Sequence, residues 1–421
     1  MRKIVPFILS LCLVLSCSEG RLKVDNSLND PLTRDGSLRI IPKEQALKTL
    51  QDFLAGENFP ATRSVTTNDS YSIETYYNND NLSTRSEDII PDAYIVNFSD
   101  NNGFAVLGAN SSVPEIVAVI ERGSISATDL SISDSSNSEP ESDSLSAFIS
   151  ELIKVGLTAD PEIKTRANTS YNTCPRLLTY SWNQGKVDTQ DVYNKYCYRT
   201  NIIGDVKYAY TGCSTTAMAM IVTYNEFPTT LTLNGLTIDW PEMKTAYSAN
   251  NLSADGKEYV SRLMGSIFNA VDKVVNPGST LITPEQIKKR MEDFGYLNVE
   301  KWSNSIFSPG MINKASEMLG DRKPVFMSAI PKKWGNAHSW VIDGAKYSGE
   351  TYCFHFNFGW SGLCNGYFAT NCLNPGKGVE YDSSRADNTS SEMDYTYTWH
   401  FRMLAYDIPT YDWFVSLGFT Y

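Results

Sequence analysis

The chain has 421 residues, which at about 150 residues per domain allows two or three domains with sizeable cores. Hydrophobic residues make up 42% and charged residues 20%, a globular composition that excludes a wholly disordered or fibrous protein. The net charge of -12 repels phosphate backbones, so we expect no nucleic acid among its partners. The sequence has only three histidines, and their spacing fits no zinc motif, so we expect no metal site and no cofactor.

The N-terminus has the features of an export signal. A basic pair precedes an apolar stretch, residues 4–15, that is too short to span a bilayer core of about 30 Å. The stretch ends at Ser16-Cys17, which resembles a bacterial lipobox, where the cysteine becomes the lipidated first residue. We therefore expect residues 1–17 to be a signal peptide with lipobox, and the exported protein to be held at the membrane of the cell envelope only through lipid on Cys17. The alternative is ordinary signal cleavage that discards Cys17.

The next part of the chain predicts a small α+β domain. Residues 18–37 form a polar linker, and the domain is expected to cover residues 38–166. It contains neither cysteine nor histidine, so nothing in it suggests chemistry. Local patterns predict a helix after Pro42 up to Leu54, a hairpin of strands 93–98 and 104–107, a strand at 116–120, a serine-rich loop at 131–146 and a short helix at 145–155. Residues 55–92 show little periodicity.

The composition changes at the polar junction 162–168. All eight tryptophans, all three histidines and the six cysteines after the signal segment lie beyond it, so we expect a second domain at residues 167–421. Six cysteines could form three disulfides in an oxidising compartment, and five remain if one is a reactive thiol.

One of these cysteines has the setting of a nucleophile. Gly212-Cys213 is followed by small polar residues and an alanine and methionine run, which predicts a loop that opens into a buried helix. Unpaired amides and the helix dipole at such an N-terminus favour thiolate over thiol. A buried structural cysteine, or half of a disulfide, explains this segment alone equally well.

Two strand-like segments carry histidine and asparagine. His338 begins an apolar strand that is expected to end at a turn at Gly344. Further on, alternation places three phenylalanines on one face and His355 with Asn357 on the other. Asn357 lies about 6.6 Å from His355 along the strand and is poorly placed to orient it, whereas a hairpin would let it face His338. A lone histidine in a strand is otherwise a structural residue.

Together these segments give a cysteine at a helix start and then a histidine and an amide from a sheet, the Cys-His-Asn arrangement of papain-like acyl transfer. The chain also resembles the streptopain family of cysteine peptidases over about residues 172–370. The resemblance rests on four blocks in the family's order: Trp182-Asn183-Gln184, Gly212-Cys213 with its helix, Ala337 to Gly344, and Asn357-Phe358-Gly359-Trp360 leading to Gly366-Tyr367-Phe368. Two positions depart from the family pattern, Asn336-Ala337 in place of glycines and Phe358 in place of tryptophan.

The resemblance implies a papain-like catalytic domain with a helical lobe and an antiparallel sheet lobe, preceded by a small α+β prodomain. It implies Cys213 as nucleophile, His338 as its acid and base, and Asn357 as the residue that orients the imidazole. Gln184 and the Cys213 backbone N–H would stabilise the oxyanion, and Phe358 and Trp360 would be the shielding aromatics. Substrates would be proteins or peptides, and the chain's own prodomain would be an intramolecular inhibitor.

Three alternatives stay open. The same groups would serve an amidase or a transglutaminase-like acyltransferase of this fold. The chain could also be a non-catalytic binding or inhibitor lipoprotein with a vestigial site, although such a site would be expected to lose at least one of the four candidate residues. The N-terminal domain could be a permanent accessory domain that the junction tethers.

Overall fold

The computed structural model describes a defined set of residues, and the following account concerns these residues. They are residues 39–55, 71–77, 90–131, 150, 152–157, 171–185, 192–200, 206–275, 280–304, 307–330, 337–373 and 400–409. The predicted signal segment with Cys17, the linker and the junction 162–168 lie outside them. Within the described ranges, no helix combines the length and apolar character needed to cross a membrane.

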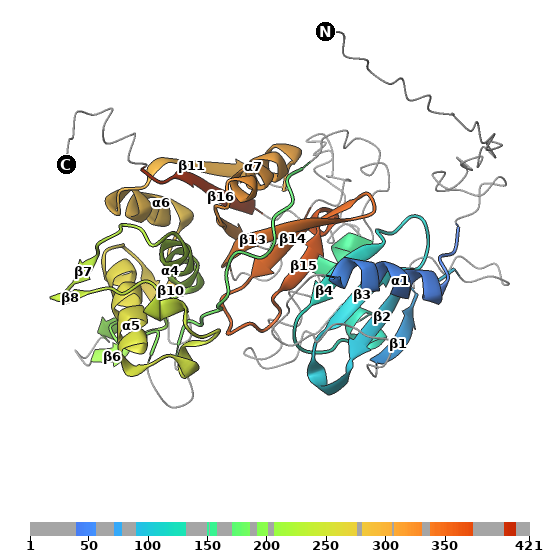
Figure 1. Cartoon of the computed structure of the whole chain (residues 1–421), viewed down its shortest axis with the longest axis horizontal. Coiled ribbons are helices and arrows are strands. Elements are labelled where there is room, and N and C mark those ends of the chain that lie inside the picture. Colours follow the sequence, from blue (N-terminus) through green and yellow to red (C-terminus); the bar gives the residue numbers. More distant parts are fainter. Residues whose placement is uncertain are drawn as a thin grey trace, which may run out of the picture.

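A single antiparallel sheet of ten strands runs through the molecule (Figure 1). The strand order is β1-β2-β3-β4-β15-β14-β13-β12-β16-β11. The first four strands are β1 (Tyr71–Tyr76), β2 (Ala93–Phe98), β3 (Phe104–Gly108) and β4 (Ile116–Ile120). The others are β11 (Leu297–Asn304), β12 (Val325–Ile330), β13 (His338–Ser348), β14 (Thr351–Asn357), β15 (Gly366–Ala369) and β16 (His400–Asp407). This large antiparallel sheet with several helices confirms the α+β class.

The described residues 39–157, here called the N-terminal module, largely follow the local predictions. Helix α1 (Lys43–Leu54) begins directly after Pro42 and buries Leu50 and Phe53. Strands β2 and β4 cover the residues predicted for them. Strand β1 was not predicted: it is the edge strand of the sheet, and only Tyr76 among its residues is buried, so it lacks an apolar run. A short helix, α2 (Ala127–Ser131), follows β4.

The turn between β2 and β3 requires a glycine. The chain passes through a short 3-10 helix, η3 (Ser99–Asn101), and reaches Gly103 with φ of 102°. A Cβ at Gly103 would lie 2.1 Å from the carbonyl oxygen of Ile120 in β4. Both the left-handed backbone and the close approach of a main-chain atom therefore exclude a side chain here.

We predict that Gly103→Ala lowers the free energy of unfolding by about 2–4 kcal/mol, because it combines a strained φ with a clash against backbone. Gly123→Ala is the matched control, since Gly123 also has a positive φ but no atom within 4 Å of the added Cβ. The control should lose only about 1 kcal/mol. Urea denaturation followed by far-UV circular dichroism in a Cys213→Ala background measures both; equal losses would contradict the role of the clash.

The N-terminal module joins the rest of the molecule through strand pairing. Strand β4 pairs with β15, with Tyr367 opposite Val119 and Phe368 opposite Ala118. Next to this seam, the ring of Phe53 from α1 meets the ring of Tyr367 edge to face at 5.4 Å. The two parts of the chain therefore share backbone hydrogen bonds and a side-chain core.

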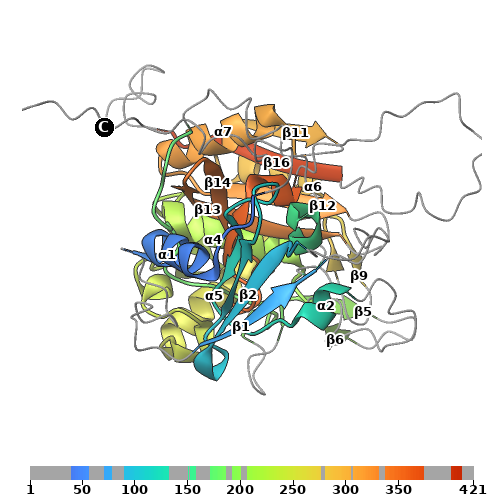
Figure 2. The same cartoon turned by 90° about the vertical axis from the view of Figure 1, so that its right-hand side faces the viewer.

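The described residues 171–409, here called the C-terminal module, place helices α4 (Cys213–Asn225), α6 (Pro284–Asp293) and α7 (Pro309–Gly320) on the sheet (Figure 2). Helix α4 packs against β12, β13, α6 and α5 (Ala254–Asn269). Nearly all residues of α4 are buried, its serine and three of its threonines included, so the helix is enclosed on nearly every side and fixed in place. The module also contains the 3-10 helices η5 (Glu242–Lys244), η6 (Ala249–Asn251) and η7 (Thr370–Leu373). Three short hairpins pair β5 (Tyr198–Thr200) with β6 (Val206–Tyr208), β7 (Thr232–Leu233) with β8 (Leu236–Thr237) and β9 (Val274–Val275) with β10 (Thr280–Leu281).

Two expectations are corrected in this module. The strand that begins at His338 does not end at Gly344: it continues to Ser348, and its pairing with β14 shifts register between Ile342 and Gly344. The glycine therefore belongs to a β-bulge rather than a turn. The possible disulfides are not formed, since all six cysteines from Cys174 onward carry free thiols.

Candidate active site

Cys213 is the first residue of α4, as the sequence predicts, and its side chain is half-buried. Gly212 precedes it with φ of 82°, and a Cβ at Gly212 would lie 2.6 Å from the carbonyl oxygen of Thr280. Glycine thus allows the chain to enter the helix tightly against its neighbour. Since α4 is packed on nearly every side, the position of Cys213 is fixed by the core.

A pair of serines ties the start of α4 to the start of β13. The Oγ of Ser214 lies 2.9 Å from the Oγ of Ser339 and donates a hydrogen bond of 2.8 Å to the carbonyl of Ile282. Both serines also lie near the Cys213 thiol and act to lower its pKa. Ser339 follows His338 directly, so this contact brings the cysteine and histidine segments together.

The imidazole of His338 is held by a backbone carbonyl. Its Nε2 lies 3.0 Å from the carbonyl oxygen of Phe358, and a carbonyl can only accept a hydrogen bond. Nε2 therefore carries the proton, which leaves Nδ1 of the neutral ring as the basic atom. The indole of Trp360 stacks on the imidazole with ring centroids 4.1 Å apart. Phe358 is fully buried, and its ring lies 6.0 Å from the same imidazole.

Asn357 lies at the end of β14, opposite Val341 of β13. Its amide oxygen accepts hydrogen bonds from the Ser181 hydroxyl at 2.8 Å and the Gly359 N–H at 3.3 Å, and its amide nitrogen donates to the Tyr180 carbonyl at 2.9 Å. The amide thus holds the 180–181 segment, and the carbonyl bound to His338 belongs to the next residue. The role of Asn357 in orienting the imidazole stays a prediction.

Gln184 is held next to the cysteine segment. Its carbonyl accepts a hydrogen bond of 2.8 Å from the backbone N–H of Thr211, two residues before Cys213. The neighbouring Trp182 carbonyl accepts one of 2.9 Å from the N–H of Ser361, in the segment after Asn357. All four sequence blocks are therefore linked by direct contacts. The role of Gln184 as an oxyanion donor stays a prediction.

The expected thiolate is not the form that this environment favours. Burial raises the pKa of the Cys213 thiol, although hydrogen bonds from Ser339 and Ser214 act in the opposite direction. Burial also lowers the pKa of His338 to about 3, and the hydrogen bond to Phe358 offsets this only in part. At neutral pH both groups are uncharged in this structure, because desolvation outweighs the hydrogen bonds that favour their charged forms.

The structure separates His355 from this site. Its ring nitrogens contact Asp343 of β13 at 2.5 Å and Glu121 of the N-terminal module at 3.1 Å. Sequence reasoning considered His355 only as a poorly placed partner for Asn357 and missed both of its acidic partners. Asp343 lies inside the block that resembles the family, but no local signal pointed to Glu121. Among the described residues, no three metal-binding side chains converge on one point.

Comparison with known proteins identifies this arrangement. The sequence profile of the peptidase C10 family matches residues 182–368, which include all four blocks. Residues 182–368 form a peptidase C10 domain, which is similar to the papain-like cysteine peptidase streptopain. Streptopain from Streptococcus pyogenes is 27% identical over 319 residues, which cover 67% of this chain and 74% of streptopain. The thiol protease/hemagglutinin PrtT of Porphyromonas gingivalis is 28% identical over 192 residues, 40% of this chain and 21% of that protein.

The fold agrees with this assignment. A fragment of prointerpain A from Prevotella intermedia superposes with a TM-score of 0.50 and 19% identity, covering 81% of this chain and 100% of the fragment. The predicted family, the papain-like fold and the enzyme class, a cysteine-type hydrolase, are thereby confirmed. The individual site residues of this C10 peptidase are predictions that the geometry supports and that experiments must test.

We predict that His338 of this C10 peptidase stays neutral down to about pH 5 in the uncleaved chain, since its pKa is lowered to about 3. Nitrogen-15 spectra of histidine-labelled Cys213→Ala protein distinguish the neutral Nε2–H tautomer from the imidazolium, and the signal lost in His338→Gln gives the assignment. An imidazolium signal for His338 at pH 6 would show that the ring is not desolvated.

Proposed function

We propose that this C10 peptidase is an endopeptidase with Cys213 as nucleophile and His338 as its acid and base. The observation that carries the proposal is the serine bridge, which holds the first turn of α4 against the residue after His338. The hydrogen bond from Nε2 to Phe358 supports it, because it leaves Nδ1 as the proton acceptor.

The chemistry follows from these groups. The Cys213 thiol gives its proton to Nδ1 of His338, and the thiolate attacks the scissile carbonyl. The imidazolium then protonates the leaving amine, and a thioester to Cys213 remains. Water attacks the thioester with His338 as base, which releases the acid product and restores the thiol. Gln184 and the Cys213 N–H would stabilise the oxyanion in both steps. Asn357 would keep the imidazole oriented by fixing the end of β14, where the carbonyl of the next residue, Phe358, accepts the hydrogen bond from His338.

We predict that Cys213→Ala and Cys213→Ser fold but lose peptide hydrolysis by about 10⁴-fold or more, because no other group replaces the nucleophile. Hydrolysis of unfolded casein, with and without a thiol-blocking reagent, measures the loss. Cys364→Ser is the control, since Cys364 is also half-buried but lies outside the site. Undiminished turnover by folded Cys213→Ala would exclude this mechanism. If the wild-type protein reacts with the thiol-blocking reagent at Cys213 but leaves casein intact, an amidase or acyltransferase is favoured instead.

We further propose that residues 38–166 are an inhibitory prodomain and that the chain is a zymogen. Two observations support this. The N-terminal module extends the sheet of the C-terminal module at β15. Prointerpain A, a precursor by its name, shares the fold across both modules.

A tethered inhibitor acts at an effective concentration of about mM, so weak docking suffices until the link is cut. We predict that a trace of active enzyme cleaves the Cys213→Ala chain between about residues 160 and 172, and that wild-type activity rises in step with this cleavage. Gel electrophoresis with N-terminal sequencing, alongside a peptidase assay, follows both. Full activity in an uncleaved wild-type chain would rule out latency and favour a permanent accessory domain.

We also propose that the protein is exported and held at the cell envelope by lipid on Cys17. The motivation is the short apolar segment that ends at a lipobox-like sequence. Cys17→Ala should then shift the protein from the membrane fraction to the soluble fraction or block its processing. Fractionation and mass spectrometry of the N-terminus measure this. An unmodified wild-type N-terminus without Cys17 would contradict lipidation.

A further inference from the structure

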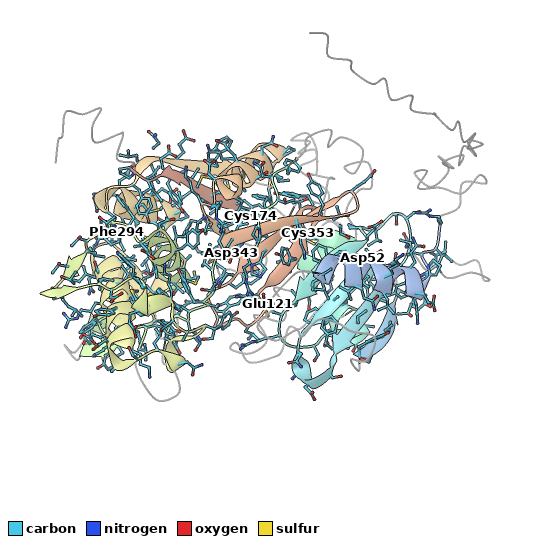
Figure 3. All side chains as sticks on the ribbon, viewed as in Figure 1. Asp52, Glu121, Cys174, Phe294, Asp343 and Cys353 are labelled. Carbon is cyan, nitrogen blue, oxygen red and sulfur yellow. The ribbon has the colours of Figure 1, made fainter. Side chains whose placement is uncertain are left out.

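Four ionisable side chains form a largely buried cluster at the boundary of the two modules, and two of them, Glu121 and Asp343, are labelled in Figure 3. Glu121 Oε1 lies 2.6 Å from Nη1 of Arg176 and 3.1 Å from Nε2 of His355. Nδ1 of His355 lies 2.5 Å from Oδ1 of Asp343. Glu121, His355 and Asp343 are each at most 1% exposed. Bulk water therefore screens these charges very little.

The cluster is assembled from both modules. Glu121 directly follows β4, whereas Arg176, Asp343 and His355 belong to the C-terminal module. Two further groups face the cluster: the Tyr247 hydroxyl lies 3.4 Å from Glu121 Oε2, and the Tyr367 ring meets the His355 ring edge to face at 4.9 Å.

Docking of the N-terminal module balances the charge of the cluster. With Glu121 in place, two carboxylates face a guanidinium and an imidazolium. Without Glu121, one carboxylate would face two cations in a largely buried site. Removing one partner from a buried ion pair is strongly destabilising, because it leaves a charge uncompensated. The cluster is therefore complete only while β4 lies on β15.

The same position connects to the active site. The backbone N–H of Glu121 donates to the carbonyl of Asn365 at 2.8 Å. The side-chain oxygen of Asn365 accepts from the N–H of Phe358 at 2.9 Å, and the carbonyl of Phe358 holds His338. The residue that fills the buried ion cluster is thus linked through two hydrogen-bonded residues to the proposed base.

We propose that Glu121 is an electrostatic latch, which holds β4 on β15 through Arg176 and His355 and makes docking of the N-terminal module depend on pH. The inference takes the prodomain of the proposed function as its starting point. It concerns docking, however, which can be measured in a chain that lacks Cys213 and has no activity. Failure of the latch and failure of the zymogen proposal are therefore distinguishable.

The direction of the pH dependence follows from the two titrating partners. Burial lowers the pKa of His355, but Asp343 and Glu121 outweigh it and raise that pKa to about 9. Loss of Glu121 removes part of this rise, so docking takes up a proton and weakens as pH increases through about 9. Burial raises the pKa of Glu121, but His355 and Arg176 outweigh it and hold that pKa below its ordinary value. Docking therefore also weakens in acid, as Glu121 becomes protonated.

Hydrogen exchange in the uncleaved Cys213→Ala chain tests the latch. We measure amides of β4 and β15 between pH 6 and 9.5, correct them for intrinsic rates, and use amides of β11 at the other end of the sheet as an internal reference. In the parent chain, the opening equilibrium of the β4 and β15 amides should increase by about tenfold from pH 6 to pH 9.5, whereas that of the β11 amides should not.

Glu121→Gln keeps the shape but removes the charge. It should increase opening at β4 and β15 by at least about tenfold at pH 7, leave β11 protected and flatten the rise toward pH 9.5. Asp52→Asn removes one charge from an exposed side chain of the same module and should behave like the parent. Parent-like opening or an unchanged pH profile in Glu121→Gln would overturn the latch. Glu121→Gln could also lose protection at β11, which would indicate general destabilisation. The parent chain then provides the test: opening at β4 and β15 that is no more pH-dependent than opening at β11 would overturn the latch.

Discussion

The backbone pairing of β4 with β15 is the interaction on which the rest of the structure depends. It converts two parts of the chain into one sheet and leaves β1, in which only Tyr76 is buried, as one edge and β11 as the other. Because strand pairing fixes register as well as distance, it also determines where residues beyond the strand ends lie. Glu121 reaches Arg176 and His355 only because it comes directly after β4.

The candidate active site depends instead on the burial of helix α4. Helix α4 is packed on nearly every side, so the position of Cys213 is set by the core rather than by a surface loop. The histidine and asparagine segments lie on the neighbouring strands β13 and β14. The proposed catalytic thiol lies on a rigid helix and the proposed base on a rigid strand, so few local contacts are needed to keep them aligned, and the Ser214–Ser339 pair supplies one.

The sequence predicted what is locally encoded. The hairpin of β2 and β3 has two apolar runs joined by a polar turn with glycine, and α4 has a glycine before a run of alanine and methionine, so both were found. Strand β1 was missed because an edge strand with little burial has no apolar pattern. The pairing of β4 with β15 joins residues far apart in the chain, and nothing in either segment specifies its partner.

Chemical properties were harder to predict than positions. The pattern around Cys213 correctly placed it at a helix N-terminus, and from that we expected a favoured thiolate. The structure reverses the direction, because the pKa depends on desolvation by elements that only the fold brings together. The carbonyl of Phe358 as the partner of His338 was likewise invisible, since backbone groups carry no sequence signal.

The raised pKa of Cys213 also bears on how the protein survives before it is used. Oxidants attack the thiolate, so a cysteine kept as a neutral thiol resists conversion to sulfenic and higher acids. All six described cysteines are unpaired, and the buried thiols of Cys197 and Cys353, with their pKa values raised to about 12, are protected in the same way. The burial that keeps the proposed nucleophile neutral in the uncleaved chain would therefore also protect its sulfur from oxidation.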